Sequence, residues 1–142
     1  MKVSERFWAK VEKTPGCWRW RGQLLRSGYG RFSVGRRSVR AHVFAYEQEY
    51  GAVPNGLCLD HLCRNKVCVN PQHLEAVTSR ENTLRGIGLT AQNARKTHCP
   101  NGHAYDAINT YIYNGRWRNC RACRAQAEAA RRSRMRSGGG AT

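Results

Sequence analysis

Residues 60–74 read DHLCRNKVCVNPQHL and hold the densest group of chemistry-bearing side chains in the sequence. Cys63, Cys68 and His73 recur in it at intervals of five residues. Two thiols and an imidazole supply three of the four soft ligands that a tetrahedral structural zinc requires. Both flanks of the stretch are polar or charged, so an ordinary apolar core explains these residues poorly. The stretch therefore predicts a zinc site in a loop.

The fourth zinc ligand has to come from another part of the chain. Cys17 stands beside Trp18, and its thiolate would tie the N-terminal segment to the loop. Cys58 is the competitor, but it lies in a short apolar run, where a cysteine packs as a small hydrophobic side chain. We favour Cys17 and predict a first zinc set of Cys17, Cys63, Cys68 and His73.

Two short strands and a helix are expected around this loop. Residues 57–59 and 74–77 are brief apolar runs, one directly before the loop and one directly after it. Thr78 followed by Glu81 has the form of a capping box, which begins a helix containing Asn82. The predicted local order is therefore strand, loop, strand, helix.

Upstream of the loop, the pattern predicts a hairpin followed by a helix. Two alternating runs surround the turn at residues 35–37, so residues 31–41 are expected to form a β-hairpin whose outer face carries arginine. Residues 41–50 have helical spacing, and Gly51 stands in the usual stop position. We expect this helix to lie on the sheet.

A second metal pattern lies near the C-terminus. Cys99 and His103 are separated by three residues, and Cys120 and Cys123 form a Cys-x-x-Cys knuckle, which together make a second tetrahedral zinc set. His98 could replace His103, although the turn at residues 100–102 favours His103. Between the pairs, Asn-Gly at 114–115 predicts a hairpin, and residues 121–136 are rich in helix-forming Ala and Arg. Taken by itself, the pattern is also that of a purely structural clip.

The run at residues 60–74, together with Glu81-Asn82, resembles the HNH endonucleases of the ββα-metal superfamily. Within them it is most similar to the zinc-containing branch near the His-Cys box homing endonucleases. The stretches CWRWRG from Cys17, GYGRF from Gly28 and RAH from Arg40 also resemble that family's N-terminal sheet and helix. The resemblance covers residues 17–86. It implies an α+β fold: a small zinc-stabilised ββα-metal nuclease core with an N-terminal antiparallel sheet, followed here by a zinc-ribbon-like module and a basic helix.

The resemblance also assigns chemical roles. His61 would be the general base that deprotonates water for attack on a phosphodiester, so activity should rise with pH through its pKa. Asp60 and Asn82 would hold a catalytic Mg²⁺ or Mn²⁺, because carboxylate and amide oxygens suit hard cations. Asn70 corresponds to the middle residue of the family motif and would hold the two strands and orient His61. In zinc-free members of the family, the histidine that corresponds to His73 can bind the catalytic metal. The cysteine spacing assigns His73 to zinc in this sequence.

Two residues before the loop carry weaker signals. Arg40 could clamp the scissile phosphate, or it could be one more solvated cation. His42, at the start of the predicted helix, is more often a satisfied structural histidine than a catalytic one.

The net charge points to a nucleic-acid partner. Among 142 residues, 25 Lys and Arg against 9 Asp and Glu give a formal charge of +16, which attracts a polyanion. No apolar run is long enough to span a membrane, and the N-terminus lacks the hydrophobic segment of a signal peptide. We therefore expect double-stranded DNA as partner and no membrane. The expected phosphate contacts are Arg31, Arg36 and Arg37 on the first hairpin and Arg116, Arg118, Arg121, Arg124 and Arg131 near the C-terminus, although charge runs are often only solvated.

These patterns predict four segments. They are a nuclease domain at residues 1–86, a linker at 87–97, a zinc-binding and Arg-rich DNA-contacting module at 98–136, and a disordered tail at 137–142. Seven cysteines in a chain without a secretion signal favour metal over disulfides. The expected location is the cytoplasm of a phage or bacterial system, or the nucleus in a eukaryote, and not the secreted fraction.

Three functions fit the pattern to different degrees. A metal-dependent DNA endonuclease with two structural zincs explains Asp60, His61 and Asn82 together. A non-catalytic zinc-dependent DNA-binding protein has no need for that triplet, and an RNA-binding or ribosome-associated protein explains only the charge. One active site makes one cut, so nicking or, in a homodimer, double-strand cutting both stay open, as do the target site and the biological role in homing, restriction or phage packaging.

Overall fold

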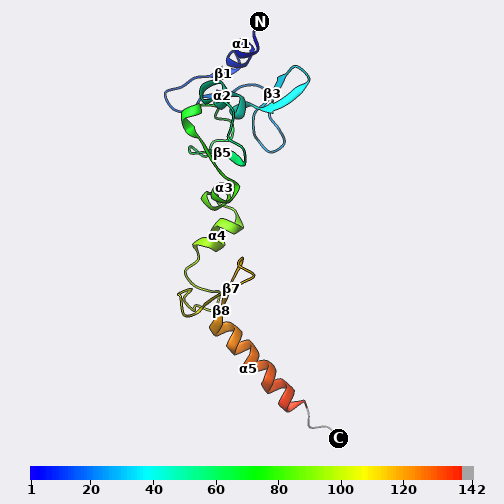
Figure 1. Cartoon of the computed structure of the whole chain (residues 1–142), viewed down its shortest axis with the longest axis vertical. Helices are drawn as coiled ribbons and strands as arrows, with labels where there is room; N and C mark the ends of the chain where they lie inside the picture. Colours follow the sequence, from blue (N-terminus) through cyan, green and yellow to red (C-terminus); the bar gives the residue numbers. More distant parts are fainter. Residues whose placement is uncertain (139–142) are drawn as a thin grey trace. The chain divides into compact units, whose positions relative to one another are not determined.

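The computed structural model describes residues 1–138, and it is α+β (Figure 1). The chain forms two compact units, which divide between Gly86 and Ile87. The first unit contains, in chain order, α1 (Val3–Trp8), β1 (Val11–Glu12), β2 (Arg19–Trp20), β3 (Arg31–Val34), β4 (Arg37–Arg40), α2 (Ala41–Tyr50), β5 (Leu57–His61), the 3₁₀ turn η1 (Pro71–His73), β6 (Leu74–Thr78) and α3 (Ser79–Arg85). Its strands pair as three separate antiparallel ribbons, β1–β2, β3–β4 and β5–β6.

An aromatic cluster forms the core of the first unit. Phe7 of α1 is fully buried, and its ring stacks on Trp20 and meets Phe32 edge-on, both at 5.0 Å between centroids. The register of the β3–β4 hairpin pairs Phe32 with Val39 on the side that faces this core. The neighbouring pair, Arg31 opposite Arg40, therefore points to the other side, as alternation along a strand requires.

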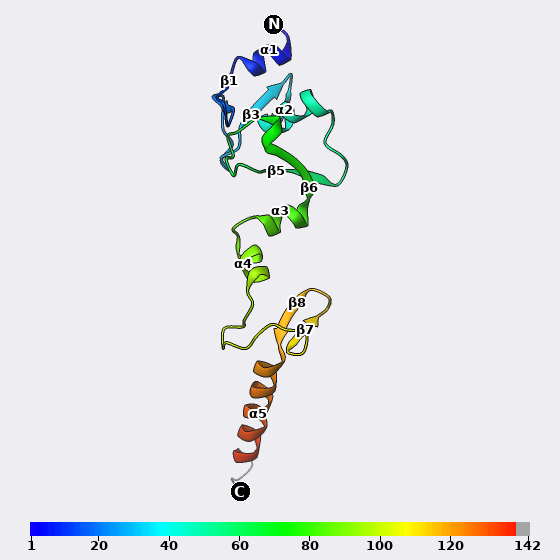
Figure 2. The ribbon, with the colours of Figure 1, turned by 90° about the vertical axis from the view of Figure 1, so that its left-hand side faces the viewer.

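The β5–β6 ribbon and α3 follow the predicted order, and Figure 2 shows α3 directly after β6. The register runs from Leu57 opposite Thr78 to His61 opposite Leu74, so both strands are slightly longer than the sequence pattern indicated. Thr78 caps α3: its hydroxyl accepts a hydrogen bond from the Glu81 N–H, and the Glu81 carboxylate accepts one from the Thr78 N–H. This reciprocal cap fixes where the ribbon ends and the helix begins.

The second unit contains α4 (Leu89–Arg95), β7 (Thr110–Tyr113), β8 (Trp117–Cys120) and α5 (Arg121–Ser137). Asn114 and Gly115 both have positive φ, at 50° and 64°, as a tight hairpin turn between β7 and β8 requires. No residue of α5 is buried. None of the helices in residues 1–138 has the length and apolar character that a membrane span requires.

Two boundaries of the second unit differ from the sequence-based expectation. Residues 87–97, expected to be a linker, contain α4, because its Ala-containing sequence can form a short helix that buries Ala91 completely. The predicted tail was to begin at residue 137, but Ser137 is the last residue of α5. The rest of that predicted tail, residues 139–142, lies outside the described residues.

Candidate active site and metal centres

The first metal cluster gathers the four side chains Cys17, Cys63, Cys68 and His73, whose ligand atoms all lie within 4.8 Å of one another. The Nδ1 atom of His73 is 3.7 Å from the Cys17 Sγ and 3.6 Å from the Cys68 Sγ. Zinc bonds of about 2.3 Å to sulfur and about 2.0 Å to nitrogen would hold such atoms about 3.5 Å apart in a tetrahedron. The cluster therefore has the size and ligand set that zinc requires.

Cys17, and not Cys58, completes this cluster. The thiol of Cys58 lies 3.5 Å from the Val77 carbonyl on the neighbouring strand. Burial raises the pKa of Cys68 to about 12. Its thiolate form at neutral pH therefore needs a cation close by, which a bound metal would supply.

Asn70 holds the two chain segments that carry the first cluster. Its amide nitrogen donates to the Gly16 carbonyl at 3.1 Å, next to Cys17, and its side-chain oxygen accepts from the Gln72 N–H at 3.1 Å. The second bond caps η1, the turn that presents His73. Asn70 was predicted to hold the two strands and to orient His61; its side-chain bonds run across the loop to Gly16 and Gln72, and its effect on His61 stays a prediction.

The second metal cluster lies within the second unit and consists of Cys99, His103, Cys120 and Cys123. The His103 Nδ1 is 3.3 to 3.6 Å from the sulfur atoms of the three cysteines. Burial opposes the shift, but hydrogen bonds from the Cys123 N–H and the Asn109 amide lower the pKa of Cys120 to about 6. A thiolate is thus available to a metal at neutral pH. His98, the alternative ligand, is exposed and contacts Thr97 instead.

His61 lies at the end of β5 and is only 6% exposed. Its Nε2 donates a hydrogen bond to the Cys68 carbonyl at 3.0 Å, which leaves the lone pair on Nδ1. Burial lowers the pKa of His61 below 6.5, although this hydrogen bond and the nearby Asp60 act in the opposite direction. At neutral pH the ring is neutral and able to accept a proton. The bond to Cys68 also ties the orientation of His61 to the first metal cluster.

Asp60 is a buried carboxylate directly before His61, with 4% of its surface exposed. Its Oδ1 accepts a hydrogen bond from Arg64 at 2.6 Å, and its Oδ2 is 3.6 Å from an Arg85 nitrogen. Within residues 1–138, Oδ2 has no hydrogen-bond partner. A buried carboxylate oxygen without a hydrogen bond is costly, and a bound cation would satisfy it.

Asn82 lies on α3, over the same face of β5 as Asp60. Its amide nitrogen is 3.5 Å from the Cys58 Sγ. Cys58 and Asp60 are two residues apart on β5, so their side chains lie on the same face of the strand. Arg85, one helical turn after Asn82, reaches Asp60 from the same side of the helix. The carboxylate of Asp60 and the amide oxygen of Asn82 are the hard ligands that Mg²⁺ or Mn²⁺ prefers.

Aromatic and basic side chains surround His61 on its other side. The His42 ring meets the His61 ring edge-on, with centroids 4.6 Å apart, and Tyr29 lies 5.8 Å from His61. Arg40 and Lys66 each place their charge over the Tyr29 ring, 5.4 Å from its centre. Arg40 is therefore joined to the surroundings of His61 through Tyr29.

Sequence reasoning gave no role to Tyr29, Arg64 or Arg85. Tyr29 stands in the Gly-Tyr-Gly stretch that marked the family resemblance, and Arg64 is four residues after Asp60. Arg85 follows Asn82 at helical spacing. These positions in the sequence were the signals from which the contacts of Tyr29, Arg64 and Arg85 with Asp60 and His61 could have been predicted.

The arginines expected to bind DNA differ in their surroundings. Those exposed on the surface of their own unit are Arg31, Arg36, Arg37, Arg116, Arg121, Arg124 and Arg131. Arg118 is half-buried: its guanidinium donates to the Asn93 carbonyl at 2.6 Å and covers the Tyr105 ring at 4.1 Å. Arg118 thus holds α4 and β8 together within the second unit.

Comparison with known proteins finds a family that is similar to this part of the chain. The HNH endonuclease family matches residues 39–84. Protein 7.7 of Escherichia phage T7 is 39% identical over 67 residues, which make up 47% of this chain and 52% of that protein. Protein 2.8 of the same phage is 32% identical over 84 residues, 58% of each chain.

A third relative, the uncharacterized gene 5.3 protein of Enterobacteria phage T3, is 31% identical over 64 residues, 41% of this chain and 63% of the relative. The chain thus spans between 52% and 63% of the length of these curated phage relatives. No solved structure matches the chain. The match from β4 to α3 covers the strand pair, the loop and the helix that carry Asp60, His61 and Asn82, and this part of the chain is therefore similar to the HNH endonuclease family.

Proposed function

We propose that the chain is a metal-dependent endonuclease that hydrolyses phosphodiester bonds in duplex DNA. The observation that carries this proposal is the pairing of two buried groups at the end of β5. His61 is neutral and bound through Nε2, so Nδ1 can take a proton, and Asp60 next to it has an oxygen without a hydrogen bond. A protein that only binds DNA gains nothing from burying this pair.

In the proposed reaction, His61 accepts the proton of a water molecule as that water attacks the scissile phosphorus. The bond between the phosphorus and the 3′-oxygen breaks, and the 3′-oxygen leaves and takes a proton from solvent water. Asp60 and Asn82 hold Mg²⁺ or Mn²⁺, which when bound offsets the negative charge that develops on the phosphate. Arg40 pairs with the phosphate from the side of Tyr29. The Cys68 carbonyl keeps the His61 ring in one orientation throughout.

Two structural zinc ions complete the proposed protein. The first would fix the loop whose Cys68 carbonyl orients His61, with Asn70 holding that loop to Gly16. The second would hold β8 and α5 to the Cys99 turn. Neither zinc contacts the substrate in this proposal.

The exposed arginines of both units would contact duplex DNA through its phosphates. Arg31 and Arg40 lie directly opposite each other on the outer face of the β3–β4 hairpin. Two like charges in that position repel each other, and a phosphate between them would remove the penalty. One chain carries one such active site, so it would nick one strand, and a homodimer would be required to cut both.

A non-catalytic zinc-dependent DNA-binding protein is the second candidate, and one observation favours it. Arg64 and Arg85 already neutralise Asp60. If these two cations are permanent partners of the carboxylate, Asp60 does not need a metal. The competition between arginine and metal for Asp60 is therefore what the experiment has to decide.

The deciding experiment incubates the zinc-loaded full chain with supercoiled plasmid, with and without Mg²⁺. The endonuclease is expected to produce relaxed circles, or linear DNA if it acts as a dimer, only when Mg²⁺ is present. His61→Ala is expected to abolish cleavage while zinc content and plasmid binding stay unchanged, because His61 is in neither metal cluster. His98→Ala is the matched control, since His98 is an exposed histidine of the other unit.

Two outcomes would contradict the proposal. Plasmid that binds but stays supercoiled with both Mg²⁺ and Mn²⁺ would favour the non-catalytic candidate. Full activity in His61→Ala would remove His61 from the mechanism. EDTA followed by excess Mg²⁺ separates the two metal roles, because the zinc content can be measured before activity is tested again.

A further inference from the structure

One face of the β7–β8 hairpin in the second unit is lined with aromatic rings. The register pairs Tyr111 with Asn119 and Tyr113 with Trp117. Because side chains alternate along a strand, these four residues share one face of the ribbon. Tyr113 is 50% exposed and Trp117 is 60% exposed. We call this set, Tyr111, Tyr113, Trp117 and Asn119, the aromatic face.

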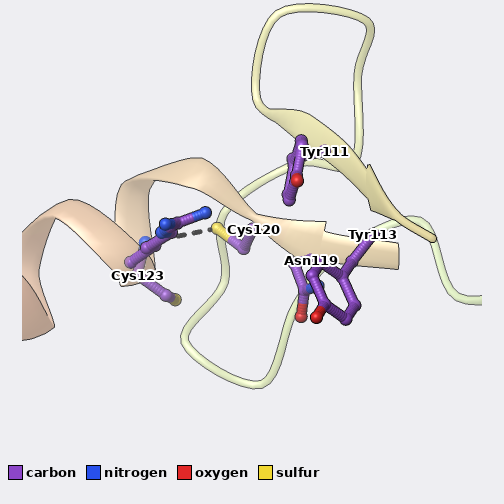
Figure 3. Close-up of a pocket in the computed structure, with 6 residues that line it drawn as sticks. Tyr111, Tyr113, Asn119, Cys120 and Cys123 are labelled. Atoms are coloured by element: carbon purple, nitrogen blue, oxygen red, sulfur yellow. Dashed lines mark hydrogen bonds between the residues drawn. The ribbon is translucent and has the colours of Figure 1, made fainter. Parts of the chain in front are cut away.

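A pocket of about 400 Å³ opens on this face (Figure 3). Tyr111, Tyr113 and Asn119 line it from the hairpin, and Cys120, Cys123 and Arg124 line it from the end of β8 and the first turn of α5. The second metal cluster thus forms one wall and fixes the hairpin against the helix. A cavity of this size, with aromatic walls and one side-chain amide, suits a flat heterocycle such as a nucleobase.

Positive charge surrounds the aromatic face. Arg121 and Arg124 lie over the Tyr111 ring, at 5.5 and 5.7 Å from its centre, and Arg116 lies over the Trp117 ring at 5.4 Å. From residue 87 onward the sequence contains only two acids, Asp106 and Glu128. Asp106 accepts hydrogen bonds from its own turn, and Glu128 pairs with Arg124. The surroundings therefore favour a ligand that combines anionic groups with aromatic rings.

The opposite face of the hairpin is used differently. Arg118 and Ile112 lie there, opposite each other in the register. Arg118 binds the Asn93 carbonyl and the Tyr105 ring, so this side is packed partly against the unit itself. The aromatic face is the side left to a partner.

We propose that the aromatic face binds unpaired bases of single-stranded DNA, with one base in the pocket and its neighbour on Trp117. Stacked bases in a duplex hide the faces that tyrosine and tryptophan rings contact, whereas unpaired bases expose them. Arg116, Arg121 and Arg124 neutralise the accompanying phosphates. The choice of DNA over RNA rests on the proposed function. Such a face would direct the second unit to frayed, gapped or branched positions in DNA.

The test uses the zinc-loaded full chain without Mg²⁺, so that binding is measured and cleavage is not. Fluorescence anisotropy compares a labelled single strand with the blunt duplex of the same sequence. Tyr113→Ala and Trp117→Ala are each expected to weaken single-strand binding by about tenfold while leaving duplex binding unchanged. Tyr113→Phe keeps the ring and should bind as the wild type does.

Ile112→Ala is the matched control, because Ile112 has the same 50% exposure as Tyr113 and lies on the opposite face of the same hairpin. It should change neither affinity. Zinc content and far-UV circular dichroism check that each variant is folded.

Three results would overturn the inference. They are equal losses for single strand and duplex in the alanine variants, no loss in either, or tighter binding of single-stranded RNA than of DNA of the same sequence. Cleavage plays no part in this measurement, so a chain without nuclease activity can still show the predicted binding, and an active nuclease can still lack it.

Discussion

His42 shows how burial beside the candidate catalytic base changes the chemistry of a single residue. Its side chain is 2% exposed, and it faces the His61 ring, the Tyr29 ring and the positive charge of Arg40. Burial, then His61 and then Arg40, lowers the pKa of His42 from 6.5 to about 3. Between about pH 6.5 and pH 3 the folded protein therefore keeps His42 neutral, whereas the unfolded chain protonates it.

This pKa difference predicts an acid-dependent loss of stability. Below pH 6.5 the unfolded chain binds a proton at His42 that the folded chain does not bind, so the free energy of unfolding falls as the pH falls towards 3. Between about pH 7 and pH 5 the contribution of His42 is about 2 kcal/mol. Urea unfolding of zinc-loaded protein at both pH values should show a smaller loss for His42→Gln than for the wild type.

His98→Gln is the control for that comparison, because His98 is an exposed histidine of the other unit. The remaining pH dependence in His42→Gln includes His61, whose pKa is lowered in the same direction. Equal losses of stability in wild type and His42→Gln would contradict the assignment of a neutral, buried His42.

The same residues show what the sequence could and could not predict about the site. The ligand sets followed from spacing, because zinc demands four soft ligands and few residues offered them. The choice of Cys17 over Cys58 followed from the apolar run in which Cys58 lies. The ion pair of Arg85 with Asp60 did not follow from the sequence, because it depends on how α3 packs on β5, whereas Arg64 pairs with Asp60 from the loop directly after β5. The partner of Asn70 could not be predicted for a similar reason, since Gly16 is remote in sequence.

At the scale of elements, the junction between β3 and α2 depends on one glycine. A Cβ atom at Gly30 would lie 2.6 Å from Trp20 Cδ1 and 2.8 Å from the Ala41 Cβ. Trp20 is 4% exposed, and its indole nitrogen donates to the Gln23 carbonyl, so the ring has little room to move. The absence of a side chain at Gly30 thus lets the hairpin, the core tryptophan and α2 meet.

Gly30→Ala is therefore expected to destabilise the first unit by about 1 to 3 kcal/mol, the usual cost of overpacking a core. Chemical denaturation followed by tryptophan fluorescence measures this loss. Gly16→Ala is the matched control, because a Cβ there has no atom within 4 Å and Gly16 does not need positive φ. Similar stabilities for the two variants would show that the Trp20 ring yields easily.

Elements with strong local signals were predictable, and those that depend on tertiary contacts were not. The hairpin at β3–β4, helix α2 and the capped start of α3 all follow from turn residues, stop residues and a capping box. Helix α4 was missed because its sequence has no apolar period. Its single buried residue, Ala91, has too small a side chain to produce a pattern.

At the scale of the whole molecule, the two units differ in what holds them together. The first has an aromatic core around Phe7. In the second, the buried apolar residues among those described are Ala91, Cys99 and Cys120, and two of these belong to the metal cluster. Because the second unit has so little apolar surface to bury, we infer that it obtains folding free energy from metal binding.

This difference predicts how the chain responds to losing single metal ligands. The wild type should bind about two zinc ions, one for each four-ligand cluster. Cys17→Ser should lower the zinc content to about one while the second unit stays folded. Cys120→Ser should also lower it to about one, but with loss of helical signal in far-UV circular dichroism, because α5 begins at that ligand. Elemental analysis and circular dichroism on the same samples give both readouts.

Cys58→Ser is the control for these two variants, since Cys58 is a half-buried cysteine of the first unit that lies outside both clusters. It should retain about two zinc ions and the wild-type helical signal. A loss of zinc in Cys58→Ser with none in Cys17→Ser would reverse the assignment of the first cluster. A full helical signal in Cys120→Ser protein that has lost the second zinc would show that the second unit folds without its metal.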